Sequence, residues 1–166
     1  MAELNHDTIK AKIVTILQAN TNLYTTTAEA DKLRSIKVGY PQGDALSNEM
    51  IPYAYVVNSS GPFETITAGQ VTSNSIQTLV HNMFYDIVVV VQGEDSRAGE
   101  KKLDDFQETI LNTLEVDHNF TGATTAAVDD SKPERIDRLR IPRTDEGKGL
   151  KGRVITYRVI KRTDQT

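Results

Sequence analysis

The first helical pattern of the chain spans residues 7–19. Ile9 and Ile13 recur on one face of it, with polar side chains on the other, and Asp7 stands where an N-cap is expected. This spacing predicts an amphipathic helix whose apolar face packs on another layer. Residues 25–31, which follow a turn, leave two readings open: a short helix or a surface loop.

A second helical pattern spans residues 98–114, and Asp95 or Ser96 precedes it as a capping residue. Acidic residues occupy much of the side opposite the apolar stripe. The pattern predicts a second amphipathic helix. Its apolar residues recur every three or four positions and are Leu103, Phe106, Ile110, Leu111 and Leu114.

Alternating apolar and polar residues predict strands elsewhere. The strand-like segment at residues 81–92 is apolar on both faces, with Tyr85 and Ile87 on one face and Val88 and Val90 on the other. Such a run is typical of a central strand that is covered on both sides. The remaining predicted strands are 35–40, 52–57, 134–141 and 153–162.

The order of these elements is helix, strands, helix, strands. Segregated runs of this kind predict an α+β fold, with a mostly antiparallel sheet and the two main helices packed on one face. We expect residues 1–166 to form a single domain. Polar, small or glycine-rich residues dominate three stretches, 63–78, 123–132 and 143–152, which we expect to be flexible loops.

Composition narrows the class of protein. A chain of 166 residues, 38% hydrophobic and 25% charged, suits one globular domain. The absence of cysteine excludes disulfides, thiolate nucleophiles and cysteine-based metal sites. No apolar run approaches the roughly 20 residues that cross a bilayer, so we expect no membrane association. The first residues lack the basic and apolar regions of a signal peptide, so we expect a protein that is not secreted.

Charge is distributed unevenly along the chain, although the net charge is only −4. Residues 132–162 hold eleven Lys and Arg against four Asp and Glu, while the rest of the chain is acidic. Two readings stay open: the basic part meets an oppositely charged surface, such as another copy, or it pairs with acidic helices inside one fold. The basic candidates for an interface are Arg135, Arg138, Arg140, Arg143, Lys148 and Lys151.

Three acidic residues are candidates for the same interface. Asp86 interrupts an apolar strand, so it is either a buried or interface charge or a residue at the point where the sheet meets water. Asp104 and Glu108 lie four residues apart on one helix face, where two carboxylates can share a cation. A solvated acidic face is the favoured reading of that pair.

Signals for catalysis are weak. The glycine-rich segment 147–152 lacks the spacing of a phosphate-binding loop and lies between strands, so we interpret it as a mobile hairpin tip. The histidines, His6, His81 and His118, are scattered and lack metal-site spacing. No nucleophile elbow is present. We expect a protein that is not an enzyme and that binds no cofactor or metal.

The basic C-terminal strands also suggest a second class of function. Binders of single-stranded nucleic acid combine basic grooves with aromatic side chains on which bases stack. Only Tyr157 lies among the basic residues of this region. A small nucleic-acid-binding module is therefore kept as an alternative.

The order of segments resembles a known family. A helix over 9–19 is followed by Ile36-Lys37-Val38-Gly39, by the strand Pro52-Tyr53-Ala54-Tyr55-Val56 and by the long strand 85–91. The second helix and a final strand over 152–161 complete the order. In this order, and in its length, the chain resembles the tail terminator (tail-completion) and head–tail joining proteins of tailed bacteriophages.

The resemblance implies a structural protein of the virion, made in the host cytoplasm, without catalytic residues. Such proteins form a ring, usually of six subunits, that caps the tail tube and offers a docking face to the head–tail connector. The implied partners are other copies of the chain, the major tail tube protein and connector or neck proteins, with passing contact to DNA in the channel. Another neck or head–tail connector protein is the nearest alternative.

Overall fold

The structure is a computed structural model that describes residues 5–27, 29, 31–40, 51–60, 64–68, 77–93, 96–120, 128–140 and 149–165. None of the helices within these ranges is long and apolar enough to span a membrane. The elements, in chain order, are α1 (His6–Ala19), β1 (Ser35–Val38), β2 (Tyr53–Asn58), β3 (Glu64–Ala68), β4 (Gln77–Gly93), α2 (Ser96–Val116), β5 (Asp130–Arg140) and β6 (Gly149–Gln165).

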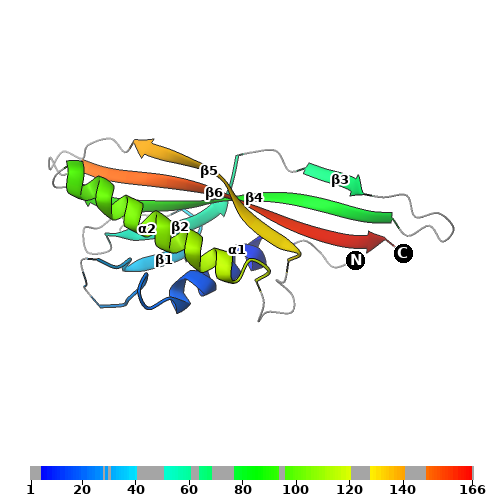
Figure 1. Cartoon of the computed structure of the whole chain (residues 1–166), viewed down its shortest axis with the longest axis horizontal. Coiled ribbons are helices and arrows are strands. Elements are labelled where there is room, and N and C mark those ends of the chain that lie inside the picture. The colour runs from blue at the N-terminus through cyan, green and yellow to red at the C-terminus, as the bar shows by residue number, and fades with distance from the viewer. Residues whose placement is uncertain are drawn as a thin grey trace.

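One six-stranded sheet organises the molecule (Figure 1). Its strands follow the order β1-β2-β4-β6-β5, and β3 also pairs with β4. Every pairing is antiparallel except that of β1 with β2. The longest pairing joins β4 to β6 without interruption, from Gln77 opposite Gln165 to Gly93 opposite Gly149. The predicted α+β class with a mostly antiparallel sheet is confirmed.

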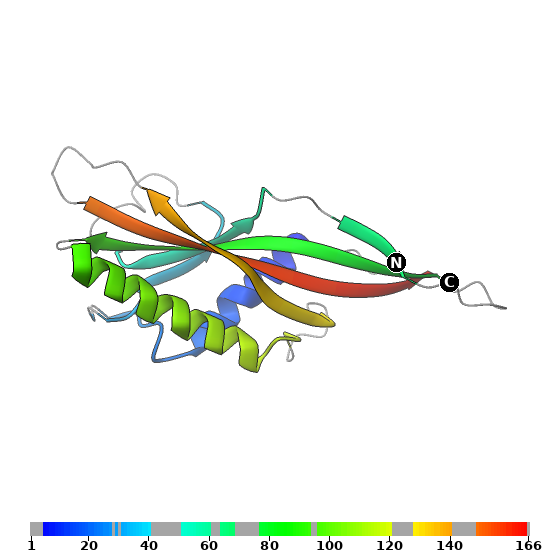
Figure 2. The same ribbon diagram turned by 45° about the horizontal axis from the view of Figure 1, so that its top comes forward.

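Both helices pack on the same face of this sheet (Figure 2). They enclose a core with alternate side chains of the central strands, because successive residues of a strand point to opposite faces. Tyr85 and Ile87 from β4 meet Ile155 and Tyr157 from β6 in this core, as the predicted alternation required. The buried residues that the helices contribute are Ile9, Ile13, Val14, Ile16, Leu17, Leu103, Phe106, Ile110 and Leu114.

The first helix begins one residue earlier than predicted and has a different cap. Asn5 is the N-cap, and its side-chain oxygen accepts hydrogen bonds from the backbone N–H groups of Asp7 and Thr8, at 3.0 and 3.1 Å. Asp7 therefore lies inside the first turn, where its negative charge faces the positive end of the helix dipole. It also pairs with Lys10 at 2.8 Å.

The strands reach further than the local sequence pattern indicated. The predicted loop 63–78 contains β3 and the first residues of β4, so that part of the prediction is wrong. The predicted loops 123–132 and 143–152 likewise contain the starts of β5 and β6. These polar residues become strand because they pair with the long neighbouring strands, and pairing outweighs intrinsic preference. Residues 25–33 form no helix where they are described, and Tyr24 bridges Leu33.

The distal halves of β4 and β6 extend past the helices as an arm, which β3 widens (Figure 1). Along β4 the core shared with the helices ends at Met83, and along β6 it ends at Val159. The residues beyond these two positions continue the strand pairing up to Gln77 and Gln165. The molecule is thus a two-layer body with a β arm projecting from one end.

A buried tyrosine links the first helix to the central strand. Tyr85 is fully buried, and its hydroxyl is hydrogen bonded to Nδ1 of His6, at 2.9 Å, and to the sulfur of Met83, at 3.6 Å. Burial is the main cause that raises the pKa of Tyr85 far above its ordinary value, and the negative charge of Asp7 raises it further. The folded protein therefore holds this phenol neutral.

We expect substitution of the two isoleucines that face each other across β5 and β6 to have unequal effects. Ile155 is fully buried, whereas its partner Ile136 is 41% exposed. Ile155→Ala should lower the free energy of unfolding by about 2–5 kcal/mol through lost burial and the cavity left behind. Ile136→Ala, the matched control, should lower it by about 1 kcal/mol or less. Urea unfolding measures both, and equal losses would contradict the two-layer core.

Tyr85 should also make stability depend on alkaline pH. The pKa of Tyr85 is raised in the folded state, so the unfolded chain loses this proton first as the pH rises past its ordinary value of 10. Stability present below that pH is then lost, by up to about 1.4 kcal/mol per pH unit for this group. Tyr85→Phe should flatten the decline in urea-unfolding measurements taken from about pH 8 to about pH 11. An unchanged slope would show that Tyr85 ionises equally in both states.

Candidate interaction surfaces

An arginine on the helix side of the sheet is surrounded by side chains of α2. Arg153 of β6 is only 7% exposed, and its guanidinium donates to carboxylate oxygens of Asp104 and of Glu100, the latter at 3.0 Å. It also donates to Oε1 of Gln107, at 2.8 Å. Lys151, two residues earlier on the same strand, lies 3.6 Å from Glu100. A buried charge needs this many partners to offset its desolvation, so Arg153 fixes α2 against the sheet.

This network shows that part of the basic segment pairs with an acidic helix inside the fold. Lys151 and Asp104, both interface candidates, belong to ion pairs inside the fold. Glu108 is exposed on the same helix and forms no hydrogen bond or ion pair within the described ranges. Asp104 is engaged by Arg153, and no cluster of metal-binding side chains occurs among the described residues. Glu108 therefore agrees with the favoured reading of a solvated acidic face, whereas Asp104 forms an ion pair with Arg153.

Sequence reasoning did not single out Arg153, although its position carries a signal. Arg153 shares a strand face with Ile155 and Tyr157, since residues two apart point the same way. An arginine in line with buried residues indicates a buried ion pair when an acidic helix is available to cover it. The identity of its partners depends on how α2 crosses the sheet, which is not readable from local pattern.

The edge strand β5 presents charged side chains to solvent. Arg135 pairs with Asp137 at 2.6 Å on the same strand. Lys132 and Arg138 are exposed and form no hydrogen bond or ion pair within the part of the chain that the structure describes. A register shift between Pro133 and Arg135 interrupts the pairing with β6. Charges, a proline and a bulge are devices that keep an edge strand from pairing indiscriminately.

The remaining basic candidates are only partly placed. Arg140 is the last residue of β5 and lies opposite Lys151 of β6, but its side chain is outside the described residues. Arg143 and Lys148 also lie outside the described residues. Of the candidates on β5, Arg138 is thus the one whose exposed cation has no described partner.

The sheet face opposite the helices carries a second apolar cluster with a tyrosine group at its edge. Tyr53 and Tyr55 of β2 point to this face, with ring centroids 6.2 Å apart, and Tyr40 lies 5.7 Å from Tyr55. Tyr40 is 70% exposed. Burial raises the pKa of the buried Tyr53 and of the half-buried Tyr55 above the ordinary value. The other members of the cluster are Ile51, Val88, Val90, Leu139, Leu150 and Val154.

Asp86 lies on this helix-free face, beside the apolar cluster. It is half-buried, and its carboxylate accepts a hydrogen bond of 2.7 Å from the hydroxyl of Thr156, directly across on β6. The next residue in the same row is Arg135 of β5. Asp86 thus occupies a partly exposed polar row between β2 and β5, which agrees with the reading of a residue where the sheet face meets water.

The glycine-rich segment is partly ordered strand. Residues 149–152 belong to β6, so this part of the predicted hairpin tip 147–152 is strand. Residues 147 and 148 lie outside the described residues. Gly152 lies opposite Leu139, and a Cβ on Gly152 would come within 3.0 Å of that side chain. This close approach gives the glycine a packing role.

The histidines are distributed over separate contacts. His6 is bound to Tyr85, as described above, and His118 lies near the backbone oxygen of Glu115, at 3.4 Å. His81 lies on the arm, on β4. The structure thus brings together none of them as ligands of a common metal within the described residues.

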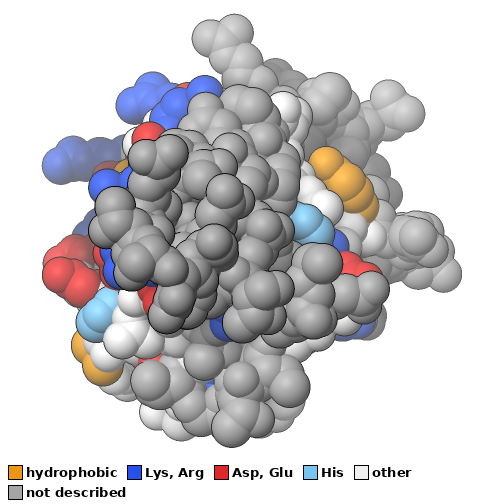
Figure 3. Space-filling view, turned by 90° about the vertical axis from the view of Figure 1, so that its right-hand side faces the viewer, with side chains coloured by type: hydrophobic (Ala, Val, Ile, Leu, Met, Phe, Trp, Pro, Cys, Tyr) orange, Lys and Arg blue, Asp and Glu red, His pale blue; other side chains and the backbone are white. Residues whose placement is uncertain are grey.

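Charge of both signs is visible when the molecule is viewed from the end of the arm (Figure 3). Lys and Arg side chains gather on one flank, and acidic side chains lie directly beside them. Two ion pairs join opposite charges on β5 and β6: Arg158 pairs with Glu134, at 3.9 Å, and Arg135 pairs with Asp137. The charged side chains coloured in this view therefore do not form a surface of one sign (Figure 3).

Known proteins resemble this chain in fold and not in sequence. The sequence matches no family model and no curated protein. Among solved structures, the fold is similar to that of a chain in the virion of a native gene transfer agent (GTA) particle, with a TM-score of 0.53. The likeness covers 93% of this chain and 95% of that chain at 14% sequence identity. At such identity it establishes a shared fold.

Arg153 should contribute more to stability than its neighbour in register, Arg138. Arg153→Met removes three charge-assisted contacts to α2 and should lower the free energy of unfolding by about 2–3 kcal/mol. Arg138→Met removes an exposed cation and should change it by about 0.5 kcal/mol or less. Urea unfolding compares the two, and an effect of Arg153→Met as small as the control would show that α2 is held by its apolar face alone.

Proposed function

We propose that this chain is a non-enzymatic structural protein of a phage-like virion, acting by contact with other virion proteins. The observation that carries the proposal is the likeness to a chain of a gene transfer agent virion, which spans nearly the whole of both chains. A match that covers 93% of this chain and 95% of the other concerns the overall architecture and not one local motif. The exposed charges of β5 are available for such contacts.

Within this class, we propose a ring-forming tail terminator. It would cap the tail tube and offer an interface to the head–tail connector, with other copies of the chain, the tube protein and neck proteins as partners. The order of elements and the strand with Tyr53 and Tyr55 support this assignment through the family resemblance. Rings need two different surfaces on each subunit that fit each other. Here β1 and β5 lie at opposite edges of one sheet, so each subunit presents two different edges.

The nucleic-acid-binding alternative receives less support. Four basic residues of the closing strands, Arg135, Lys151, Arg153 and Arg158, have carboxylate partners within the chain. Neutralised cations contribute little to phosphate binding, which depends on free Lys and Arg that displace counterions. Binding of nucleic acid with an affinity that falls steeply as salt rises would favour this alternative over the ring.

The mass of the protein in solution tests the ring. Light scattering over a wide range of protein concentrations should reveal one discrete species at a small-integer multiple of the 18.4 kDa chain, with six as the expected integer. Electron microscopy of the same sample should show closed rings. A monomer at every concentration would contradict self-assembly into a ring, and a broad distribution of sizes would contradict closure.

Arg138 is an exposed cation of β5 without a partner among the described residues, and if it belongs to the contact between subunits, reversing its charge should weaken the ring. Arg138→Glu should raise the concentration at which half of the chains are assembled by about fivefold or more, as expected for loss of about 1 kcal/mol. Lys101→Glu is the control, because Lys101 is also an exposed cation but lies on α2, where it pairs with Asp105. Circular dichroism should show both variants folded. Equal assembly of the two variants would remove β5 from the interface.

A further inference from the structure

The two outermost strands of the sheet, β1 and β5, each carry a large apolar side chain that is exposed. Val38 of β1 is 40% exposed, although it lies opposite the core residue Val56. Ile136 of β5 is 41% exposed, although it lies opposite the core residue Ile155. Residues opposite each other share a face, so both side chains lie on the helix side of the sheet, at its two edges.

The outer edge of β5 offers backbone hydrogen-bonding groups. The carbonyl of Ile160 accepts a hydrogen bond from the backbone of Asp129, at 2.9 Å, so Ile160 faces the β5 side of β6. Alternate residues of β6 face β5 in the same way. Their partners on β5 are Arg135, Asp137 and Leu139. The backbone groups of Ile136 and Arg138 therefore point outward, in a part of β5 that begins after the register shift.

The outer edge of β1 is open at its last residue. Gly39 donates its backbone N–H to the carbonyl of Val56 on β2, at 2.8 Å. Alternate residues of the strand face β2, so the backbone groups of Ile36 and Val38 point outward. The side chain of Gln18 donates to the carbonyl of Ile36, at 2.9 Å. The described residues offer no such partner to the outward N–H and C=O of Val38.

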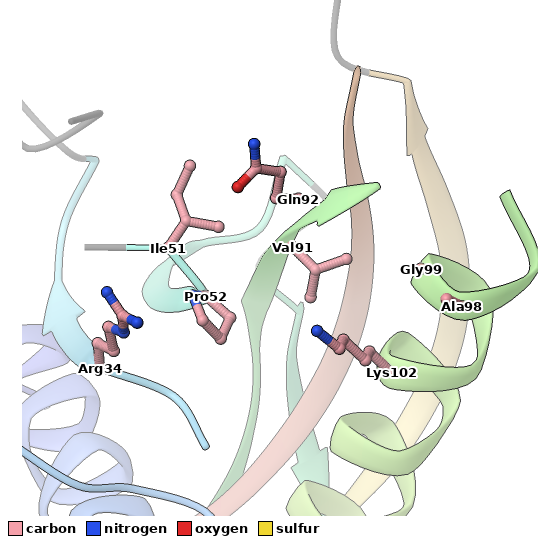
Figure 4. A pocket seen from close by; sticks show the side chains of 8 residues that line it. All are labelled: Arg34, Ile51, Pro52, Val91, Gln92, Ala98, Gly99 and Lys102. Atoms are coloured by element: carbon pink, nitrogen blue, oxygen red, sulfur yellow. The ribbon is translucent and has the colours of Figure 1, made fainter. Parts of the chain in front are cut away.

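A pocket of about 350 Å³ near β1 leaves this outer edge clear. It is lined by Arg34, which precedes β1, by Pro52, which precedes β2, and by Lys102 of α2 (Figure 4). Arg34 and Lys102 extend toward each other across it (Figure 4). The pocket thus lies inward of β1, toward β2 and α2.

A second copy that continues the sheet brings these two edges together. The strand directions make β1 and β5 antiparallel, so a copy added with its helices on the same side sets its β5 antiparallel to β1. With Ile136 of that copy opposite Val38, the outward backbone groups of both residues can bond to each other. The two exposed apolar side chains then cover each other on the helix side.

The same register matches side chains on the helix-free face. Asp137 of the added copy lies opposite Lys37, which is exposed and has no hydrogen bond or ion pair within the described ranges. Asp137 pairs with Arg135 at 2.6 Å, and a carboxylate can accept from two cations. Arg135 lies one position further along, beside the ring of Tyr40, which is 70% exposed and 5.7 Å from Tyr55. A cation over an exposed aromatic ring adds to the contact.

Neighbouring registers lose this match. A shift of two residues sets Lys37 opposite Arg135 in one direction, where like charges repel, and opposite Leu139 in the other. A shift of one residue sets side chains of the helix side against those of the helix-free face.

We propose that β1 of one copy pairs antiparallel with β5 of the next, with Val38 opposite Ile136 and Lys37 opposite Asp137. The inference rests on the proposed ring and names the contact that joins its subunits. Two different edges meet in it, so the contact repeats around a rotation axis.

Paired cysteines test the register, because the chain has none of its own. Within one chain Lys37 and Asp137 are four strand spacings apart, about 19 Å, which no disulfide spans. Across the proposed contact their Cα atoms come within about 4.5 Å. Mild oxidation of Lys37→Cys/Asp137→Cys should therefore give covalent multiples up to the hexamer on a non-reducing gel. Lys37→Cys/Arg135→Cys, two residues out of register, should cross-link about tenfold less.

Exchange of the two charges gives a second measurement. Lys37→Asp and Asp137→Lys should each raise the concentration at which half of the chains are assembled by about fivefold, because like charges then face each other. The double variant should recover most of the loss. Circular dichroism should show all variants folded, and if the cysteine pair fails to fold, the charge exchange decides.

The outcomes separate this contact from the ring itself. Equal cross-linking of the two cysteine pairs, or none in a chain that still assembles, would overturn the edge pairing while the ring stands. Cross-linked species of every size without closed rings in the electron microscope would support the edge pairing and contradict the ring. A chain that stays monomeric and forms no cross-link would overturn both.

Discussion

The pairing of β4 with β6 is the interaction on which the rest of the structure depends. It runs over the whole length of both strands, and every other strand except β1 pairs with one of the two. Both helices pack against side chains of these strands, and Arg153 on β6 fixes the position of α2. Because β4 is apolar on both faces, it is covered by the helical core on one side and contributes Val88 and Val90 to the cluster on the other.

The sequence allowed the fold class to be predicted because its main signals are local. The spacing of Ile9 and Ile13, and the apolar stripe from Leu103 to Leu114, each lie within one element. The extent of the strands was not predictable in this way. Polar residues of β3 and the ends of β5 and β6 become strand only because β4 or β6 lies beside them, and such partners are distant in sequence.

The candidate interface residues differ in whether they have a partner inside the fold, and this too depends on segments that are distant in sequence. Lys151 and Asp104 form ion pairs between β6 and α2, whereas Arg138 on the edge strand has no partner among the described residues. Net charge along a segment does not reveal which of its cations are neutralised, since that depends on how the helix crosses the sheet.

The arm gives one continuous strand two different local stabilities. Residues of β4 near Ile87 lie in the helix-covered core, whereas those before Met83 are held by neighbouring strands without that layer. Backbone amides under a packed layer exchange with solvent only when a large unit opens, while amides held by pairing alone are released by smaller fluctuations. Amide protection should therefore fall in steps along a single β-strand. The arm can then open locally while the body stays folded.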